Sequence, residues 1–177
     1  RVIRLFHSTC DGESDNVKER AWMALVDALA CRYDWGSDAS SYPNTSKDYR
    51  SMTERYVRRM KQAYDSYKDS SADVCALYAE AMMQLRPWKL WNRDDDGKTH
   101  AVTITIKTVL ERALSVWPAH IGLCHFYVHL MEMSSEPETA LSAAKHLRDS
   151  QFGHLAHMPS HIDMQVGNYG DAVEVNQ

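Results

Sequence analysis

Histidines gather in one stretch of this sequence, at spacings that suit metal binding. Seven of the nine histidines lie between residues 120 and 161. The stretch contains two motifs with helical spacing, which consist of His125, His129 and Glu132, and of His154, His157 and His161. Each residue of an α-helix advances by about 100°, so residues three, four and seven apart share one face. Each motif therefore predicts a helix that presents a stripe of metal-ligating groups.

We expect the two stripes to face each other and to hold one or two transition-metal ions. Two histidines four residues apart can bind one ion from a single helix, and a facing stripe could complete that site or form a second one. His129 and Glu132 have the three-residue spacing of helical carboxylate sites, in reverse order. Imidazoles with one or two carboxylates suit iron or zinc, whereas three imidazoles per ion suit paired copper. The identity of the metal stays open.

Several residues around the motifs are harder to place. His120 and His154 are expected at helix starts and rank below the other histidines of the stripes, and His146 is expected at the surface. Pro159 lacks a backbone donor and leaves two alternatives. It could kink the helix that carries the second motif, or it could start that helix and leave His154 and His157 in a preceding turn.

Composition indicates an ordinary globular protein. Apolar residues make up 44% and charged residues 25% of the 177 residues. The net charge of −4 does not suggest a nucleic-acid partner. No apolar run approaches the roughly 18 residues of a membrane span, so no membrane partner is expected either.

The ends of the sequence and its cysteines are the features from which we infer the cellular compartment of the protein. The chain starts at Arg1 without Met and stops at Gln177 within a helical pattern, so we interpret it as a fragment of a longer chain. Its four cysteines show no paired C-x2-C spacing and are expected to be buried thiols in a reducing compartment. We therefore expect a cytoplasmic protein.

Every segment with a clear pattern is helical, which predicts the all-α class. The expected helices cover about 14–33, 47–67, 71–85, 105–117, the first histidine motif, 139–148 and the second motif up to Gly167. Ser70 or Ser71 is the expected cap of the third helix, and Ser135 with Glu138 forms a predicted capping box. We expect a single domain of residues 1–177, built from helix pairs at 14–70, 71–118, 119–150 and a truncated 151–177.

The loop at 87–103 holds two tryptophans, Trp88 and Trp91. Because they are three residues apart, one turn could bury both against neighbouring helices. The alternative is a mobile insertion with exposed indoles. Asp94 and Asp96 mimic the start of a calcium loop, but the closing Glu would fall at Thr103, which cannot serve, so a polar turn is expected.

The histidine pairs recur in register. Ala140 and Ala172 each stand early in the second helix of a pair, 32 residues apart. Fifteen and eleven residues before them stand His125 and His129 in one pair, and His157 and His161 in the next. Such a fixed period is typical of helical repeats.

These features resemble the tetratricopeptide repeat (TPR), with a period near 34 residues and a small residue early in the second helix. The matching positions are Gly167, Tyr169 and Ala172, and, in an earlier repeat, Leu110, Ala113 and Pro118. The segments RPWKLW, LERAL, HIGLCHFYVHLMEMS and GHLAHMPSHI are similar to a histidine-rich branch of repeat-domain proteins. Pro137, Pro159 and the insertion at 87–103 depart from the repeat pattern.

The resemblance implies a right-handed α-solenoid of antiparallel helix pairs, whose first helices line a concave groove. The histidine pairs correspond to groove positions, and Glu80 aligns with His129 and His161 as a further carboxylate ligand. Two functions stay open. The chain could be a metal-binding repeat protein, even a metalloenzyme with a small-molecule substrate, or a metal-free scaffold for a peptide or protein partner. No known catalytic motif defines a reaction, and the His and Glu residues of the groove favour metal.

Overall fold

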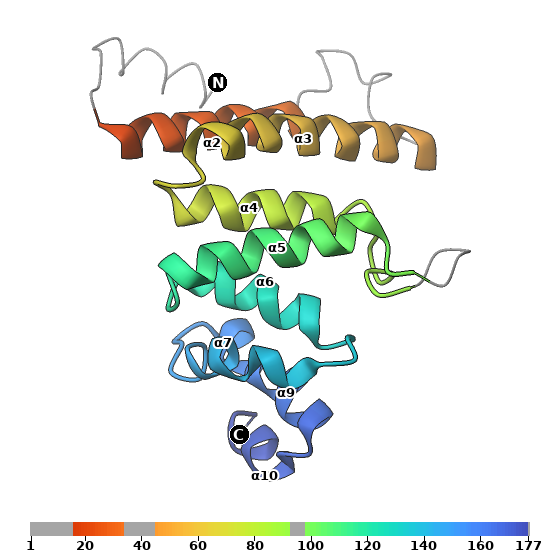
Figure 1. The fold of residues 1–177 in the computed structure, drawn as a ribbon, viewed down its shortest axis with the longest axis vertical. Coiled ribbons are helices and arrows are strands. Elements are labelled where there is room, and N and C mark those ends of the chain that lie inside the picture. The colour runs from red at the N-terminus through yellow and green to blue at the C-terminus, as the bar shows by residue number, and fades with distance from the viewer. Residues whose placement is uncertain (1–15, 34–44, 93–97, 177) are drawn as a thin grey trace. The chain divides into compact units, whose positions relative to one another are not determined.

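The computed structural model describes residues 16–33, 45–92 and 98–176 (Figure 1). Helices joined by turns make up this part of the chain, with no β-strand in it, which confirms the all-α prediction. None of the described helices is both long and apolar enough to span a bilayer. Asp94 and Asp96 of the calcium-like sequence lie outside the described residues.

The chain divides into two compact units, residues 1–85 and 86–177. The boundary falls inside the helix pair predicted at 71–118, between its two helices. The division into four pairs within a single domain stays a prediction.

The first unit contains α2 (Val17–Tyr33), α3 (Ser46–Tyr67) and α4 (Ala72–Met83). Helix α3 packs against both α2 and α4. A capping box starts α3, since the Thr45 hydroxyl accepts a hydrogen bond from the Asp48 N–H at 3.2 Å and the Asp48 carboxylate accepts one from the Thr45 N–H at 3.1 Å. Ser71 caps α4 by accepting from the Val74 N–H, as the sequence predicts.

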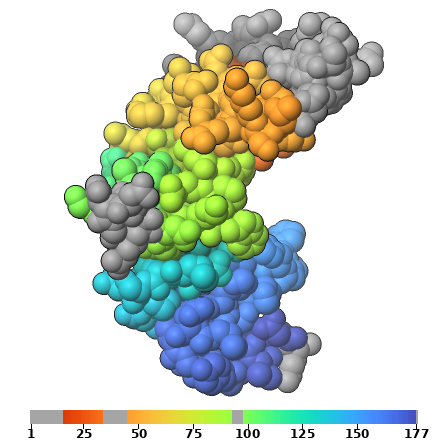
Figure 2. All heavy atoms as spheres, turned by 90° about the vertical axis from the view of Figure 1, so that its right-hand side faces the viewer, coloured from red at the N-terminus to blue at the C-terminus, as the bar shows by residue number. Residues whose placement is uncertain are grey.

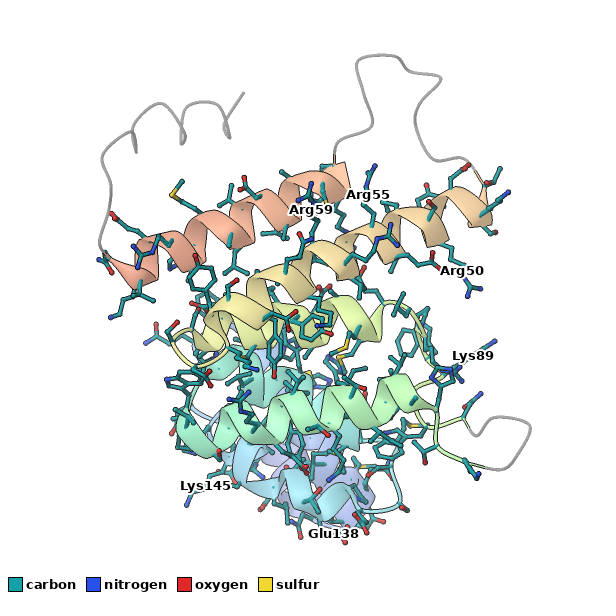
Figure 3. All side chains as sticks on the ribbon, turned by 45° about the horizontal axis from the view of Figure 1, so that its top comes forward. Arg50, Arg55, Arg59, Lys89, Glu138 and Lys145 are labelled. Carbon is teal, nitrogen blue, oxygen red and sulfur yellow. The ribbon has the colours of Figure 1, made fainter. Side chains whose placement is uncertain are left out.

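Helix α3 is amphipathic. Its apolar face buries Tyr56, Met60 and Ala63. Outside this face the helix carries exposed basic side chains, among which Arg50, Arg55 and Arg59 are labelled in Figure 3, and the Arg55 guanidinium donates a hydrogen bond to the Cys31 carbonyl of α2 at 2.7 Å. Because this apolar face is removed from water, the helix is stabilised by packing rather than by its own propensity.

The second unit is built around α6. Its elements are α5 (Ala101–Val116), α6 (Ile121–Met131), the 3₁₀ helix η2 (Pro137–Ala140), α7 (Leu141–Lys145), α8 (Gly153–His157), α9 (Pro159–Val166) and α10 (Tyr169–Glu174). Helix α6 packs against α5, η2, α7 and α9, and α9 packs against α8 and α10. Figure 2 shows the residues around α6, in cyan, lying against the blue C-terminal residues of the same unit.

The helix predicted at 139–148 is shorter than expected and begins as a 3₁₀ helix. Glu136 rather than Ser135 occupies the cap position, and Pro137 follows at the first helical position. No side chain caps η2, so the predicted capping box of Ser135 and Glu138 is wrong. Proline fixes its own φ and suits a first turn, so the helical segment begins at Pro137, two residues before the predicted start.

Pro159 starts a new helix, as one of the two alternatives has it, but His154 and His157 lie in a short helix of their own rather than in a turn. Helix α8 ends at His157 and α9 begins at Pro159. Met158 between them keeps right-handed helical angles, φ −55° and ψ −36°, so the chain turns little at the break. His157 and His161 therefore remain neighbours although they belong to different helices. Gly167, with φ 83°, ends α9 in the left-handed conformation that glycine tolerates best.

In the tryptophan loop, Trp91 contacts the helices of the second unit, whereas Trp88 does not. The Trp91 N–H donates a hydrogen bond to the Leu130 carbonyl of α6, and the Thr103 hydroxyl donates to the Leu90 carbonyl. Trp88 is 98% exposed, so the prediction that both indoles are buried is wrong for this residue. Its backbone has a positive φ of 62°, which turns the chain sharply there.

Candidate metal centre

Helix α6 carries the first histidine motif on its half-buried side. Its fully packed face consists of Leu123, Cys124, Tyr127, Val128, Leu130 and Met131. The His120 ring caps the helix by accepting a hydrogen bond from the Leu123 N–H at 3.3 Å. His125 and His129 lie one turn apart on the other side, followed by Glu132 at the C-cap. Core packing thus fixes the direction in which these groups point.

His154 approaches this stripe from the short helix α8. Its Nε2 atom lies 3.1 Å from Nε2 of His125, with the two rings perpendicular. Met158 and Ile162, which follow in the chain, are completely buried and hold this segment against the core. His154 was expected to be a weaker ligand than the other histidines of the stripes, because the sequence does not show that α8 brings its ring beside His125.

Ring nitrogens of His125, His129 and His154 all lie within 4.8 Å of one another. Nitrogen ligands bind an ion such as zinc at about 2.1 Å, so two of them in a tetrahedral site are about 3.4 Å apart. The 3.1 Å contact of His125 and His154 is already close to that value. Side-chain movements on the order of 1 Å would complete a three-histidine site.

Glu132 joins the two motifs. One carboxylate oxygen lies 3.2 Å from Nδ1 of His129, and the other accepts a hydrogen bond from Nδ1 of His161. Burial raises the pKa of Glu132, but the hydrogen bonds from the two histidines outweigh this effect and lower the pKa to about 2. An ionised carboxylate can only accept, so both histidines donate through Nδ1–H. When these two imidazoles are neutral, their Nε2 atoms carry the lone pairs.

A second histidine pair lies beyond Glu132. Nε2 of His161 and Nε2 of His157 are 3.1 Å apart. Nδ1 of His157 lies 2.6 Å from the Asn176 amide oxygen, and the Asn176 NH₂ group donates to the Ala172 carbonyl at 2.6 Å. Nothing in the sequence pattern indicated Asn176, which follows α10 and is 19 residues from His157.

The half-buried imidazole of His125 is neutral at physiological pH. Burial is the main cause, and the neighbouring imidazoles of His129, His154 and His161 add to it, so the pKa of His125 falls to about 4. The pKa of His161 changes in the opposite direction. Its hydrogen bond with Glu132 raises this pKa, although burial lowers it. A neutral imidazole keeps the lone pair that a metal ion requires.

The structure thus brings six of the seven predicted site residues together in the second unit: His125, His129, Glu132, His154, His157 and His161. We call this set the histidine cluster. His146 is exposed, as predicted, and ends α7.

Glu80, the seventh predicted ligand, lies in the first unit. The Tyr56 hydroxyl donates to one of its oxygens at 3.2 Å, and Arg32 lies 3.6 Å from the other. Burial raises the pKa of Tyr56, and the Glu80 carboxylate adds to this effect. The role of Glu80 as a metal ligand stays a prediction.

Comparisons with known protein families, with curated proteins and with solved structures gave no match to this chain.

Proposed function

We propose that this chain is a TPR-like helical-repeat protein that binds a transition-metal ion through His125, His129 and His154. The observation that carries the proposal is the convergence of three ring nitrogens within 4.8 Å. Imidazole donors suit zinc, copper and iron, and metal sites with three histidine ligands and an open fourth position occur in zinc enzymes.

The surroundings of the three histidines support a binding role. The neutral state of His125 favours ligation, and Glu132 fixes the ring of His129 with its Nδ1–H bonded to a carboxylate. Ligating histidines commonly have such a partner, which sets the tautomer and increases ligand basicity. Because both Glu132 oxygens already accept hydrogen bonds, we assign this residue to orientation rather than to direct ligation.

Solvent access favours an open coordination position. His154 is exposed, so water or a small substrate can reach an ion at this place. When bound, such an ion supplies Lewis acidity or an activated water, which is the chemistry of hydrolytic metal sites. The residues define no particular substrate.

The repeat character is supported by two small residues. Ala140 and Ala172, which occupy equivalent positions of the proposed repeats, are both buried. In that arrangement α6 and the segment of α8 and α9 are the first helices of consecutive pairs, and α6 packs against α9. Stacked first helices bring equivalent positions of successive repeats together, which accounts for the meeting of the two histidine motifs.

Elemental analysis of untagged protein, purified without chelator and then titrated with Zn²⁺, tests the proposal. We expect stoichiometric metal in the wild type and the loss of one equivalent in a His125→Ala/His154→Ala variant that keeps its helical circular dichroism. His146→Ala, which removes an exposed histidine outside the cluster, is the matched control. Absence of bound metal and of uptake on titration with Zn²⁺, Cu²⁺ and Fe²⁺ would reject the proposal and favour the metal-free scaffold for a peptide partner.

A further inference from the structure

We propose that His157 and His161 form a second metal site, joined to the first through Glu132, so that the chain binds two ions. The second site uses none of the three ligands proposed above and does not require the first to be filled. It is defined by the 3.1 Å approach of the two Nε2 atoms and by the partners of the two Nδ1 atoms.

The hydrogen bonds determine where the imidazole protons lie. Glu132 accepts from Nδ1–H of His161. The Asn176 NH₂ group is bonded to the Ala172 carbonyl, so the amide oxygen faces His157 and accepts from its Nδ1–H. The Ser160 hydroxyl donates to the His157 carbonyl at 2.8 Å and lies 3.4 Å from the same Nδ1, where it too can accept.

Both Nε2 atoms of this pair therefore carry lone pairs in the neutral tautomers. Two lone pairs that face each other at 3.1 Å repel and form no hydrogen bond. An ion bound by both nitrogens converts this contact into two favourable bonds. The pair is arranged as a metal chelate needs it, with each ring fixed from behind by a hydrogen-bond acceptor.

The separation of the nitrogens indicates the class of ion. With bonds of about 2.1 Å, nitrogens 3.1 Å apart subtend an angle of about 95° at the ion. Such an angle suits adjacent positions of an octahedral or tetragonal ion such as Cu²⁺ or Ni²⁺. Linear two-coordinate binding would place the nitrogens about 4.2 Å apart and is not compatible with this geometry. His157 is exposed, so water can fill the remaining positions.

Glu132 is the positioning residue that both sites share. One of its oxygens holds His129 of the first site and the other holds His161 of the second. The rings of His129 and His161 are 5.9 Å apart between centroids, so the two sites adjoin without sharing a histidine. Loss of this carboxylate should weaken both sites, whereas loss of Asn176 should weaken only the second.

Titration of the full chain with Ni²⁺, followed by calorimetry and elemental analysis, counts the sites. We expect two equivalents for the wild type and for the His146→Ala control. The double variants His157→Ala/His161→Ala and His125→Ala/His154→Ala should each keep one equivalent. Asn176→Leu should reduce the affinity of the second site by about 10–100-fold, with the first site as an internal reference.

Other results would reject the second site, the number of ions, or both proposals. A single equivalent that survives in His157→Ala/His161→Ala at full affinity would show that a proton rather than an ion joins these two nitrogens, and would leave the proposed function intact. A single equivalent lost in both double variants would indicate one shared ion instead of two. No uptake of Ni²⁺, Zn²⁺ or Cu²⁺ by the wild type would reject both proposals. Circular dichroism of each variant distinguishes lost ligands from lost structure.

Discussion

Replacing Glu132 by Gln tests how one carboxylate positions two histidines. Gln keeps the size of the side chain but presents one oxygen and one NH₂ group. The oxygen can still accept from one Nδ1–H, whereas the NH₂ group faces the other. His129 or His161 must then move its proton to Nε2 and lose the lone pair that would bind metal.

The expected magnitude follows from the loss of one oriented ligand. Removal of the partner of a ligating histidine lowers metal affinity by about 10–100-fold, which corresponds to about 1.4–2.8 kcal/mol. Competition of the protein with a chromophoric chelator for Zn²⁺ measures this change. Glu138→Gln is the matched control, because Glu138 is exposed on η2 and outside the cluster (Figure 3). An affinity of Glu132→Gln within twofold of both wild type and control would refute the orienting role.

The same substitution has a separate signature in metal-free protein. The pKa of Glu132 is about 2 in the folded chain, since burial, which raises it, is outweighed by the hydrogen bonds from the two histidines. The unfolded chain, with an ordinary carboxyl pKa, therefore takes up the proton first as pH falls. The stabilisation is complete above pH ~4.5 and is lost towards pH ~2, by about 1–3 kcal/mol after solvent screening. Urea unfolding should show wild type and Glu132→Gln converging over this range. Curves that stay parallel would contradict the assignment.

Four substitutions test the scaffold by urea unfolding. Trp91→Phe removes the indole hydrogen bond to α6 and should lower the free energy of unfolding by about 1 kcal/mol, whereas Trp88→Phe, at a 98% exposed position, should change it by less than about 0.5 kcal/mol. Arg148→Met leaves the fully buried Asp163 carboxylate without its two hydrogen bonds and should cost about 3 kcal/mol; a cost below about 1 kcal/mol would contradict this. Thr45→Ala breaks the capping box and should cost about 1 kcal/mol, and unchanged stability would show that the cap is not needed.

The helices could be predicted from the sequence where local signals decide them. Ser71 stands before an apolar run and caps α4, and the three- and four-residue spacing of Tyr56, Met60 and Ala63 gives the buried face of α3. Helix α5 begins at Ala101, earlier than predicted, because the His100 ring accepts a hydrogen bond from the Val102 N–H. A histidine cap is not a common sequence signal, so the start could not be placed.

The spacing of the histidines within each motif could be predicted from the sequence, but the contacts between residues of different helices could not. Helical spacing puts His125 and His129 on one face whatever the rest of the fold does. The approach of His154 depends on how α8 packs, and the contact with Asn176 depends on α10, so neither follows from a local pattern. Glu132 was expected as a ligand because its spacing resembles that of carboxylate sites, but spacing does not reveal what its oxygens accept.

The last three helices are short, so an ion bound by the histidine cluster would affect the conformational entropy of this part of the chain. Helices α8, α9 and α10 have five, eight and six residues, whereas isolated helices need about 12–15 to persist in water. An ion that joins His125 to His154 would act as a staple across 29 residues of chain. A covalent cross-link of that span restricts the unfolded state by about 3–4 kcal/mol. Metal supply would then set the folded population of this segment, and protection of residues 150–176 from proteases would report how much metal the surroundings offer.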